Sequence, residues 1–270
     1  MSKIYVSGKM PLLALRGMVV FPEQTVHFDI GRMKSAMALE KAMKNDQQLL
    51  LVPQKDILED DPGLPGLYPI GTVVKVKQIL KSQGENIRVL VTGLYRAKIT
   101  ELTQFEPYLA GQVESIPAPE YVNSLRDKAL RREAVSLYET YLDLAEHPAQ
   151  GIHLRILASD NCGFIADSIA QNSGMDYKDK AKLLCQVNPA RRLEQTILLL
   201  RQELKVLQLE SDIQERTRAV MDQDQRDYYL REQMKAIREE LGEGDEYAEL
   251  SEYEKKILKL KKHNFPPRSN

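Results

Sequence analysis

Apolar and polar residues alternate in short runs over the first 116 residues, as they do in β-strands with one face in a core and the other in water. The clearest runs are 71–80 and 87–92, which flank a polar loop at 82–86 and predict a β-hairpin. Further strands are expected at 12–16, 26–30, 49–52, 95–103 and 108–116, with one helix at 33–45. Several short strands with a single helix predict a small closed or nearly closed β-barrel.

From about residue 120 the apolar positions recur every three or four residues, which is the spacing of an amphipathic helix. Leu130, Ala134, Leu137 and Tyr141 form such a stripe. Shorter helices are expected at 151–158, 162–171 and 177–187. The sequence therefore predicts an all-α bundle after the barrel.

A very long helix is expected to begin at Asn188-Pro189, because asparagine caps helices and proline suits their first turn. No glycine or proline follows until after residue 241, and a helix of this length would span about 78 Å. One apolar stripe lies near its start and another near its end: Leu193, Ile197, Leu200, Leu204 and Leu207, then Leu230, Met234, Ile237 and Leu241. The stripe fails between 214 and 227, so the helix should be packed at its start, exposed in its middle and paired again at its end.

These patterns together predict an α+β fold with three parts. Residues 1–117 are expected to form the β-barrel and 118–188 the helical bundle. Residues 189–270 are expected to form the long helix and, after Gly242 and Gly244, a second arm that completes a coiled-coil hairpin.

Charge and composition narrow the possible partners. The 38 basic and 39 acidic side chains leave a formal net charge of -1, and neither half carries the basic excess that RNA binding would need. Cys162 and Cys185 form no Cys-x-x-Cys pair, so a disulfide scaffold and a thiolate zinc site are not expected. Because no apolar run approaches the roughly 20 residues of a membrane helix, we expect a soluble, cytoplasmic protein without a membrane partner.

Residue types typical of catalysis do not gather in this sequence. It contains no Gly-x-x-x-x-Gly-Lys-Ser/Thr loop for phosphates, and its four histidines are not spaced as metal ligands. His153 and Cys162 are better explained as ordinary helix residues than as a base and its nucleophile. Asp60 and Asp61 fit a solvated loop better than a pair of acid and base carboxylates. No catalytic, cofactor-binding or metal-binding residue is therefore expected in this chain.

A run of apolar residues interrupts the alternation at the end of the first strand: Met18, Val19, Val20, Phe21 and Pro22. These residues either fill the core where the barrel turns a corner, or form a partly exposed patch for protein ligands. The core interpretation is slightly favoured.

Methionine and tyrosine side chains form further candidates for adaptable apolar binding. Met33 begins the helix after the second strand, and four more lie on the long helix: Met221, Tyr228, Tyr229 and Met234. Packing on the barrel, or within a coiled-coil seam, is the alternative explanation.

Several motifs of this sequence are similar to those of a known family. PLLALRGMVVFP (11–22), GRMKS (31–35), GTV (71–73) and VTGLYR (91–96) resemble the N-terminal domain of the ATP-dependent protease Lon. QRDYYLREQMKAI (225–237), with ELG at 240–242, is similar to the long helix that precedes the ATPase module of Lon. Met33 stands where the family usually has an acidic residue, while Arg32 and Lys34 keep the basic residues of that turn.

The resemblance implies a PUA-like β-barrel, a helical bundle and a long helix that leads into ATPase and Ser-Lys protease modules, which are expected to be absent from this chain. The parent enzyme would be a homohexamer that uses ATP and Mg. This chain would be a non-catalytic region that recognises unfolded or damaged proteins and supports hexamer assembly for protein quality control. Substrate contacts are then expected at residues 18–22, at Arg32, Met33 and Lys34, and at the four residues of the long helix. A stand-alone protein-binding scaffold or adaptor is the alternative, and an RNA-binding PUA-like module is less favoured.

Overall fold

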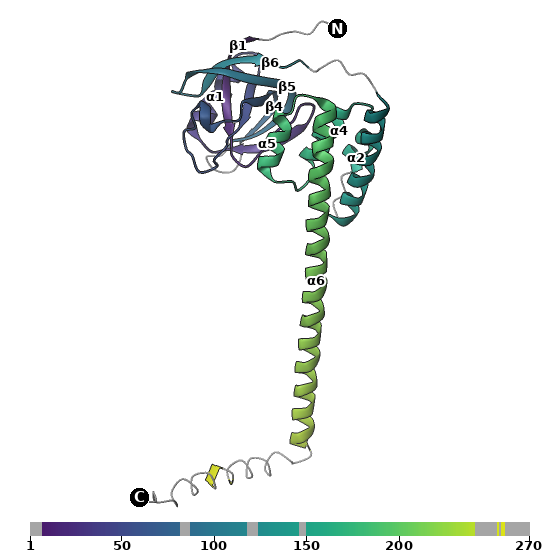
Figure 1. The fold of residues 1–270 in the computed structure, drawn as a ribbon. Helices are drawn as coiled ribbons and strands as arrows, with labels where there is room; N and C mark the ends of the chain where they lie inside the picture. Colours follow the sequence, from purple (N-terminus) through teal and green to yellow (C-terminus); the bar gives the residue numbers. More distant parts are fainter. Residues whose placement is uncertain are drawn as a thin grey trace, which may run out of the picture. The chain divides into compact units, whose positions relative to one another are not determined.

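The computed structural model describes residues 7–81, 87–117, 124–145 and 150–240, with the isolated positions 253, 255 and 256. The chain forms two compact units, residues 1–208 and residues 209–270. The first unit contains all the strands, helices α1 to α5 and the start of α6 (Figure 1). The second contains the remainder of α6.

The described part of the first unit has six strands, five of which close into a barrel while the sixth, β2 (Thr25–Ile30), pairs with only one of them. The six strands are β1 (Ser7–Leu15), β2 (Thr25–Ile30), β3 (Gln48–Pro53), β4 (Ile70–Lys81), β5 (Ile87–Gln104) and β6 (Ala110–Ser115). Their order is β2-β5-β4-β3-β1-β6, and β6 pairs again with β5, which closes the ring. The pairing of β1 with β3 is parallel and the others are antiparallel. Helix α1 (Met33–Met43) connects β2 to β3, and a short 3-10 helix, η1 (Leu64–Gly66), precedes β4.

Alternate residues of β1 pack in two different apolar clusters. Successive side chains of a strand point to opposite faces, and both faces of β1 are covered. Leu13 and Leu15 pack in a cluster that contains Leu39 and Ala42 of α1. Leu12 and Ala14 pack in the other barrel cluster, with residues of β3 to β6. The barrel therefore has an apolar core on each side of this strand.

Strand β5 joins two strands that the sequence predicted separately, 87–92 and 95–103. It pairs with β2 through its first part and with β6 through its last part. Gly93, between the two predicted strands, lies where a Cβ atom would be 2.3 Å from the carbonyl oxygen of Phe21. This glycine permits a close approach of two chain segments, so the strand continues through it.

Five continuous helices follow the barrel in the described part of the chain, and the expected α+β fold is confirmed. They are α2 (Leu125–Leu144), α3 (Gln150–Leu157), α4 (Cys162–Gln171), α5 (Tyr177–Cys185) and α6 (Pro189–Glu240). Side chains cap the N-termini of α2, α4 and α5: these are Ser124, Asn161 and Asp176, respectively. The core of this bundle includes Tyr138, Ile165 and Leu184, and Leu193 and Leu200 from the start of α6.

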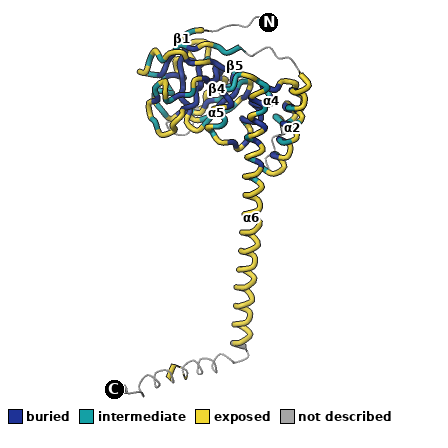
Figure 2. The backbone as a smooth tube through the Cα atoms, in the orientation of Figure 1, coloured by how far each residue is buried: buried dark blue, intermediate teal, exposed yellow. Residues whose placement is uncertain are grey.

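The stripe at the start of α6 is packed as predicted, whereas residues 209–238 are exposed throughout (Figure 2). Leu230, Met234 and Ile237 of the second stripe are more than half exposed among the described residues. The expected second arm lies almost entirely outside the described residues, and only Tyr253, Lys255 and Lys256 of it are seen as helical. The boundaries at 117 and 188 stay predictions. No helix among the described residues is long and apolar enough to cross a membrane.

Candidate functional site

The apolar segment 18–22 lies between the barrel core and the helical core. Val20 packs in the barrel cluster with α1, while Val19 and Phe21 on either side of it pack in the helical cluster. Their exposed fractions are 3% for Val19, 1% for Val20 and 0% for Phe21. The run is apolar at every position because both of its faces are covered.

The structure therefore corrects the exposed-patch interpretation for Val19, Val20 and Phe21, since a side chain enclosed on every side has no surface to offer a ligand. Met18 and Pro22 at the ends of the run are half-buried. A ligand contact at those two positions stays a prediction.

Hydrogen bonds attach this segment to both halves of the first unit. The hydroxyl of Thr72 on β4 donates to the carbonyl of Val20 over 2.5 Å, and the amide of Phe21 donates to Oε1 of Gln171 on α4 over 3.2 Å. Nε2 of Gln24 donates to Oγ of Ser168 over 3.0 Å, and both side chains are buried. Barrel and bundle thus share polar as well as apolar contacts along one connection.

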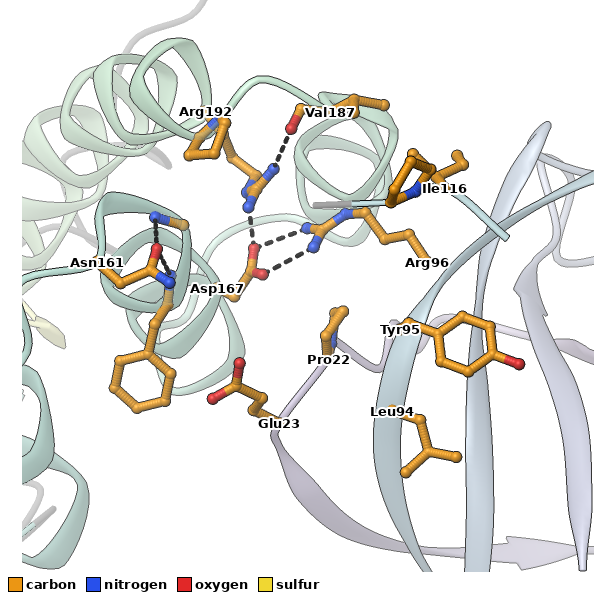
Figure 3. Close-up of a pocket in the computed structure, with 14 residues that line it drawn as sticks. Pro22, Glu23, Leu94, Tyr95, Arg96, Ile116, Asn161, Asp167, Val187 and Arg192 are labelled. Atoms are coloured by element: carbon orange, nitrogen blue, oxygen red, sulfur yellow. Dashed lines mark hydrogen bonds and ion pairs between the residues drawn. The ribbon is translucent and has the colours of Figure 1, made fainter. Parts of the chain in front are cut away.

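A small pocket opens beside this segment, where the barrel meets α4 and the start of α6 (Figure 3). We call it the junction pocket, and its volume is about 160 Å³. It is lined by Pro22, Glu23, Leu94, Tyr95, Arg96, Ile116, Pro117, Asn161, Gly163, Phe164, Asp167, Val187, Pro189 and Arg192.

Two arginines share one carboxylate in this pocket. Nη1 and Nη2 of Arg96 on β5 donate to Oδ2 and Oδ1 of Asp167 on α4 over 2.9 and 2.7 Å, a bidentate pair. Nε of Arg96 also donates to the carbonyl of Leu184 over 2.9 Å. Nε of Arg192 on α6 lies 2.9 Å from Oδ1 of the same carboxylate. One side chain of the bundle therefore binds both the barrel and the long helix.

Burial lowers the pKa of Arg192. The pKa of Arg192 is lowered to about 10, mainly because the side chain is removed from water; the Asp167 carboxylate opposes this shift and the Arg96 charge adds to it. Arg192 stays protonated at neutral pH even so. The cluster consequently holds two positive charges and one negative charge away from solvent.

A second pocket lies at the end of the barrel where α1 begins. We call it the barrel-end pocket; its volume is about 290 Å³, and it is lined by Leu12, Ala14, Arg32, Met33, Lys34, Ser35, Asp60, Asp61, Pro62 and Leu109. Met33 is 76% exposed, while Leu12 and Leu109 are buried. The structure thus brings three of the predicted residues, Arg32, Met33 and Lys34, to one apolar pocket with a charged rim.

Ion pairs hold the rim of the barrel-end pocket. Nζ of Lys34 lies 2.8 Å from Oδ1 of Asp61 and 2.7 Å from Oε1 of Glu106, and hydrogen bonds to both carboxylates raise the pKa of Lys34. Arg32 donates to the carbonyls of Ala14 and Asp60 over 2.8 and 3.1 Å. These basic side chains connect the loops around the pocket and leave Met33 as its exposed apolar element.

The four predicted residues of the long helix lie in the second unit and are exposed: Met221 by 60%, Tyr228 by 68%, Tyr229 by 64% and Met234 by 55%. Their expected contact with substrates is compatible with this exposure and stays a prediction.

The sequence did not point to the charged cluster of the junction pocket, although Pro22, a predicted contact residue, lines this pocket. A signal was present at Asp167, because a carboxylate within the apolar stretch of α4 requires a buried partner. The partners are 71 and 25 positions away in the chain, however, and nothing local identifies them. Neither Arg96 nor Arg192 stands out in its own element.

The remaining residues considered for chemistry have neighbours within hydrogen-bond or ion-pair distance. Cys162 is buried with its Sγ 3.8 Å from the carbonyl of Asp127, and Nε2 of His153 lies 3.5 Å from Oε1 of Glu139. Asp60 and Asp61 pair with Arg16 and Lys34. In the part of the chain that the structure describes, no group of three or more His, Cys, Asp and Glu side chains could hold a metal ion.

Comparison with known proteins gives one consistent family. Residues 9–202 match the family described as the ATP-dependent protease La (LON) substrate-binding domain. The chain is 37% identical over 254 residues to a Lon protease of Heliobacterium modesticaldum and 39% identical over 264 residues to one of Brevibacillus choshinensis. These alignments cover 94% and 97% of this chain, but only 31% and 34% of the relatives. The chain thus spans about a third of their length.

Solved structures agree with the fold. The N-terminal domain of Mycobacterium avium complex Lon protease aligns with a TM-score of 0.60 at 25% identity, over 72% of this chain and 98% of that one. The Lon N-terminal domain protein from Xanthomonas campestris aligns with a TM-score of 0.52 at 16% identity, over 71% and 98% of the two chains.

Proposed function

Because the chain belongs to the family of Lon substrate-binding domains, we propose that it recognises unfolded or damaged polypeptides and delivers them to an ATP-dependent protease. The match of residues 9–202 to that family is the observation that carries this proposal. For the whole protein we propose a cytoplasmic homohexamer in which ATP and Mg drive unfolding and a Ser-Lys site cleaves the chain. Its role would be protein quality control, with this region supporting hexamer assembly.

The exposed apolar side chains supply a physical reason for recognition of unfolded chains. A receptor for many sequences needs side chains that adapt to different apolar partners, and the flexible thioether of methionine does so. Met33 offers such a group above the buried floor of the barrel-end pocket. Met221, Met234 and the adjacent tyrosines offer more along α6. Folded proteins bury the apolar residues that would bind here, so they would be poor ligands.

Site-specific photo-crosslinking tests the proposal. A photoreactive phenylalanine analogue placed at Met33, Tyr228 or Met234 should capture a reduced, carboxymethylated model protein and not the same protein in its native fold. Leu125 is the matched control, because it is apolar and 88% exposed but lies outside the barrel-end pocket and the exposed part of α6.

Two results would count against the proposal. One is equal capture at Leu125 and at the three test positions, which would indicate collision rather than binding. The other is capture of the native and unfolded forms in the same yield, which would favour a general scaffold over a receptor for unfolded chains.

A further inference from the structure

The junction pocket contains an excess of buried positive charge. Arg96 is 8% exposed, Arg192 is 5% exposed and Asp167, the carboxylate between them, is 4% exposed. Burying an ionised group is unfavourable unless an opposite charge accompanies it. One carboxylate balances only one of the two guanidinium groups, so the cluster retains one positive charge.

Arg192 is also incompletely hydrogen-bonded. Its Nη1 donates to the carbonyls of Gln186 and Val187 over 2.5 and 3.2 Å. Its Nε lies close to Asp167 but is not aligned for a hydrogen bond. Nη2 donates none of the hydrogen bonds among the described residues, and it is not one of the fully buried atoms without a partner, so it keeps some access to solvent. A buried guanidinium therefore retains unused donors.

The free donors of Arg192 lie over the first turn of α4. A Cβ atom on Gly163 would be 2.7 Å from Nη2, so the glycine makes room for the guanidinium there. The positive end of the α4 dipole adds to the potential at this point. Glu23 is the other charged residue of the lining, and it is exposed at the edge of the pocket (Figure 3).

We propose that the junction pocket binds a small oxyanion, a carboxylate or phosphate group, through the free donors of Arg192. The oxyanion supplies the second negative charge that the two arginines lack, and its oxygens accept the unused N–H groups. The pocket, with a volume of about 160 Å³, has room for one such group. The anion comes either from free phosphate or from the carboxylate of a bound polypeptide.

A titration of the 270-residue protein followed by NMR tests this site. The probes are inorganic phosphate, an N-acetylated dipeptide with a free terminal carboxylate, and the same dipeptide amidated, all at constant ionic strength. We expect saturable shifts of the Gly163 and Phe164 amides and of the Arg192 Nε–H, with millimolar affinity for at least one anion. Response to phosphate alone, to the free carboxylate alone or to both supports the site and identifies the source. The amidated dipeptide should cause none of these shifts.

Three variants test whether the NMR shifts come from an anion bound beside Arg192 in the junction pocket. Gly163→Ala places a methyl group at Nη2 and should weaken binding at least about tenfold, without unfolding a helix that tolerates alanine well. Glu23→Gln removes a repelling charge from the edge and should tighten binding about two- to fivefold. Arg126→Gln is the control, because Arg126 is an exposed arginine of α2 that does not line the pocket, and it should change nothing.

The proposal is overturned if neither anion shifts these resonances up to about 50 mM, a range that covers millimolar affinity. It is also overturned if Gly163→Ala binds as tightly as the parent, or if the shifts scatter over exposed basic residues. A Glu23→Gln protein that is less stable and binds no tighter would show that the Glu23 side chain occupies the site itself, which would equally exclude an external anion.

Discussion

Phe21 shows how two neighbouring side chains can belong to different cores. It is fully buried in the helical cluster, whereas Val20 beside it lies in the barrel cluster. The residue consequently stabilises the contact between the two halves of the first unit as well as its own segment.

Truncation of Phe21 should therefore be severe. We expect Phe21→Ala to lower the free energy of unfolding by about 3–5 kcal/mol, because it leaves a cavity in a packed core. Phe105→Ala, at a phenylalanine that is 52% exposed, should cost less than about 1 kcal/mol. Urea unfolding followed by circular dichroism measures both values, and similar losses for the two variants would contradict the burial of Phe21.

Asp167 is the residue on which both buried arginines depend. Asp167→Asn removes the only carboxylate of the cluster and should destabilise the protein by about 3–5 kcal/mol, since two guanidinium groups remain buried without a counter-charge. Asp160→Asn changes a carboxylate that is 88% exposed and pairs with Arg131, so it should cost less than about 1 kcal/mol. Equal midpoints of urea unfolding for these two variants would rule out a special role for Asp167.

At the scale of elements, the start of α2 couples stability to pH. Asp127 accepts hydrogen bonds from the backbone amide and the hydroxyl of Ser124 over 3.0 and 2.8 Å, and these bonds hold its pKa below 3.8. A lowered carboxyl pKa gives stability that is fully present above the unfolded value and is lost as the pH falls through the folded value.

Asp127→Asn should accordingly flatten the acid side of the stability profile. The parent protein loses this contribution below about pH 4, whereas the variant has no carboxyl to titrate at that position. At neutral pH the variant should be less stable by about 0.5–2 kcal/mol, the usual value of a helix cap. Urea midpoints between neutral pH and about pH 2.5 provide the measurement, and a parallel acid limb in both proteins would contradict it.

Elements with strong local signals were predictable from the sequence, and those set by distant contacts were not. The length of α6 followed from the absence of glycine and proline, and its packed start followed from the stripe at Leu193. The union of two predicted strands into β5 depends on the approach of Phe21 to Gly93, which are far apart in the chain. The burial of the segment 18–22 depends on a helical core built more than a hundred residues later.

The two parts of α6 should differ in local stability. An isolated helix is marginal in water, and most of its stability in proteins comes from packing. Residues 209–238 are exposed, whereas Leu193, Ile197, Leu200 and Leu204 are buried. Amide hydrogen exchange of the 270-residue protein should therefore be faster by about tenfold or more in 209–238 than in 193–204, and equal protection would show that the exposed part is packed against a partner in solution.

At the scale of the whole molecule, barrel and bundle should unfold together. Val19, Phe21 and the Arg96–Asp167 pair connect them through buried contacts, so neither half can lose its structure without exposing the core of the other. We expect urea transitions measured by NMR signals of bundle residues such as Ile165 and of barrel residues such as Val73 to coincide. Two separated transitions would show that the halves are independent.

The two candidate sites differ in how far the sequence alone could predict them. Residues 31–35 could be identified because a short motif carries them, and they do line one pocket. The charged cluster of the junction pocket could not be identified: Arg96 ends the motif 91–96 and Asp167 lies in an apolar stretch, but nothing in the sequence pairs them with each other or with Arg192. Only the assembled fold brings them within a few ångströms of each other.

The alternation of residues 19 to 21 between two cores also limits how members of this family can be recombined. A chimaera with its crossover between β6 and α2 would pair the Val19 and Phe21 of one parent with the helical core of another, and the volumes would match only by chance. A crossover in the exposed part of α6 breaks no buried contact of this kind among the described residues. Exchange of binding surfaces between relatives should therefore be designed with barrel and bundle inherited as one block, and with the joint placed after residue 208.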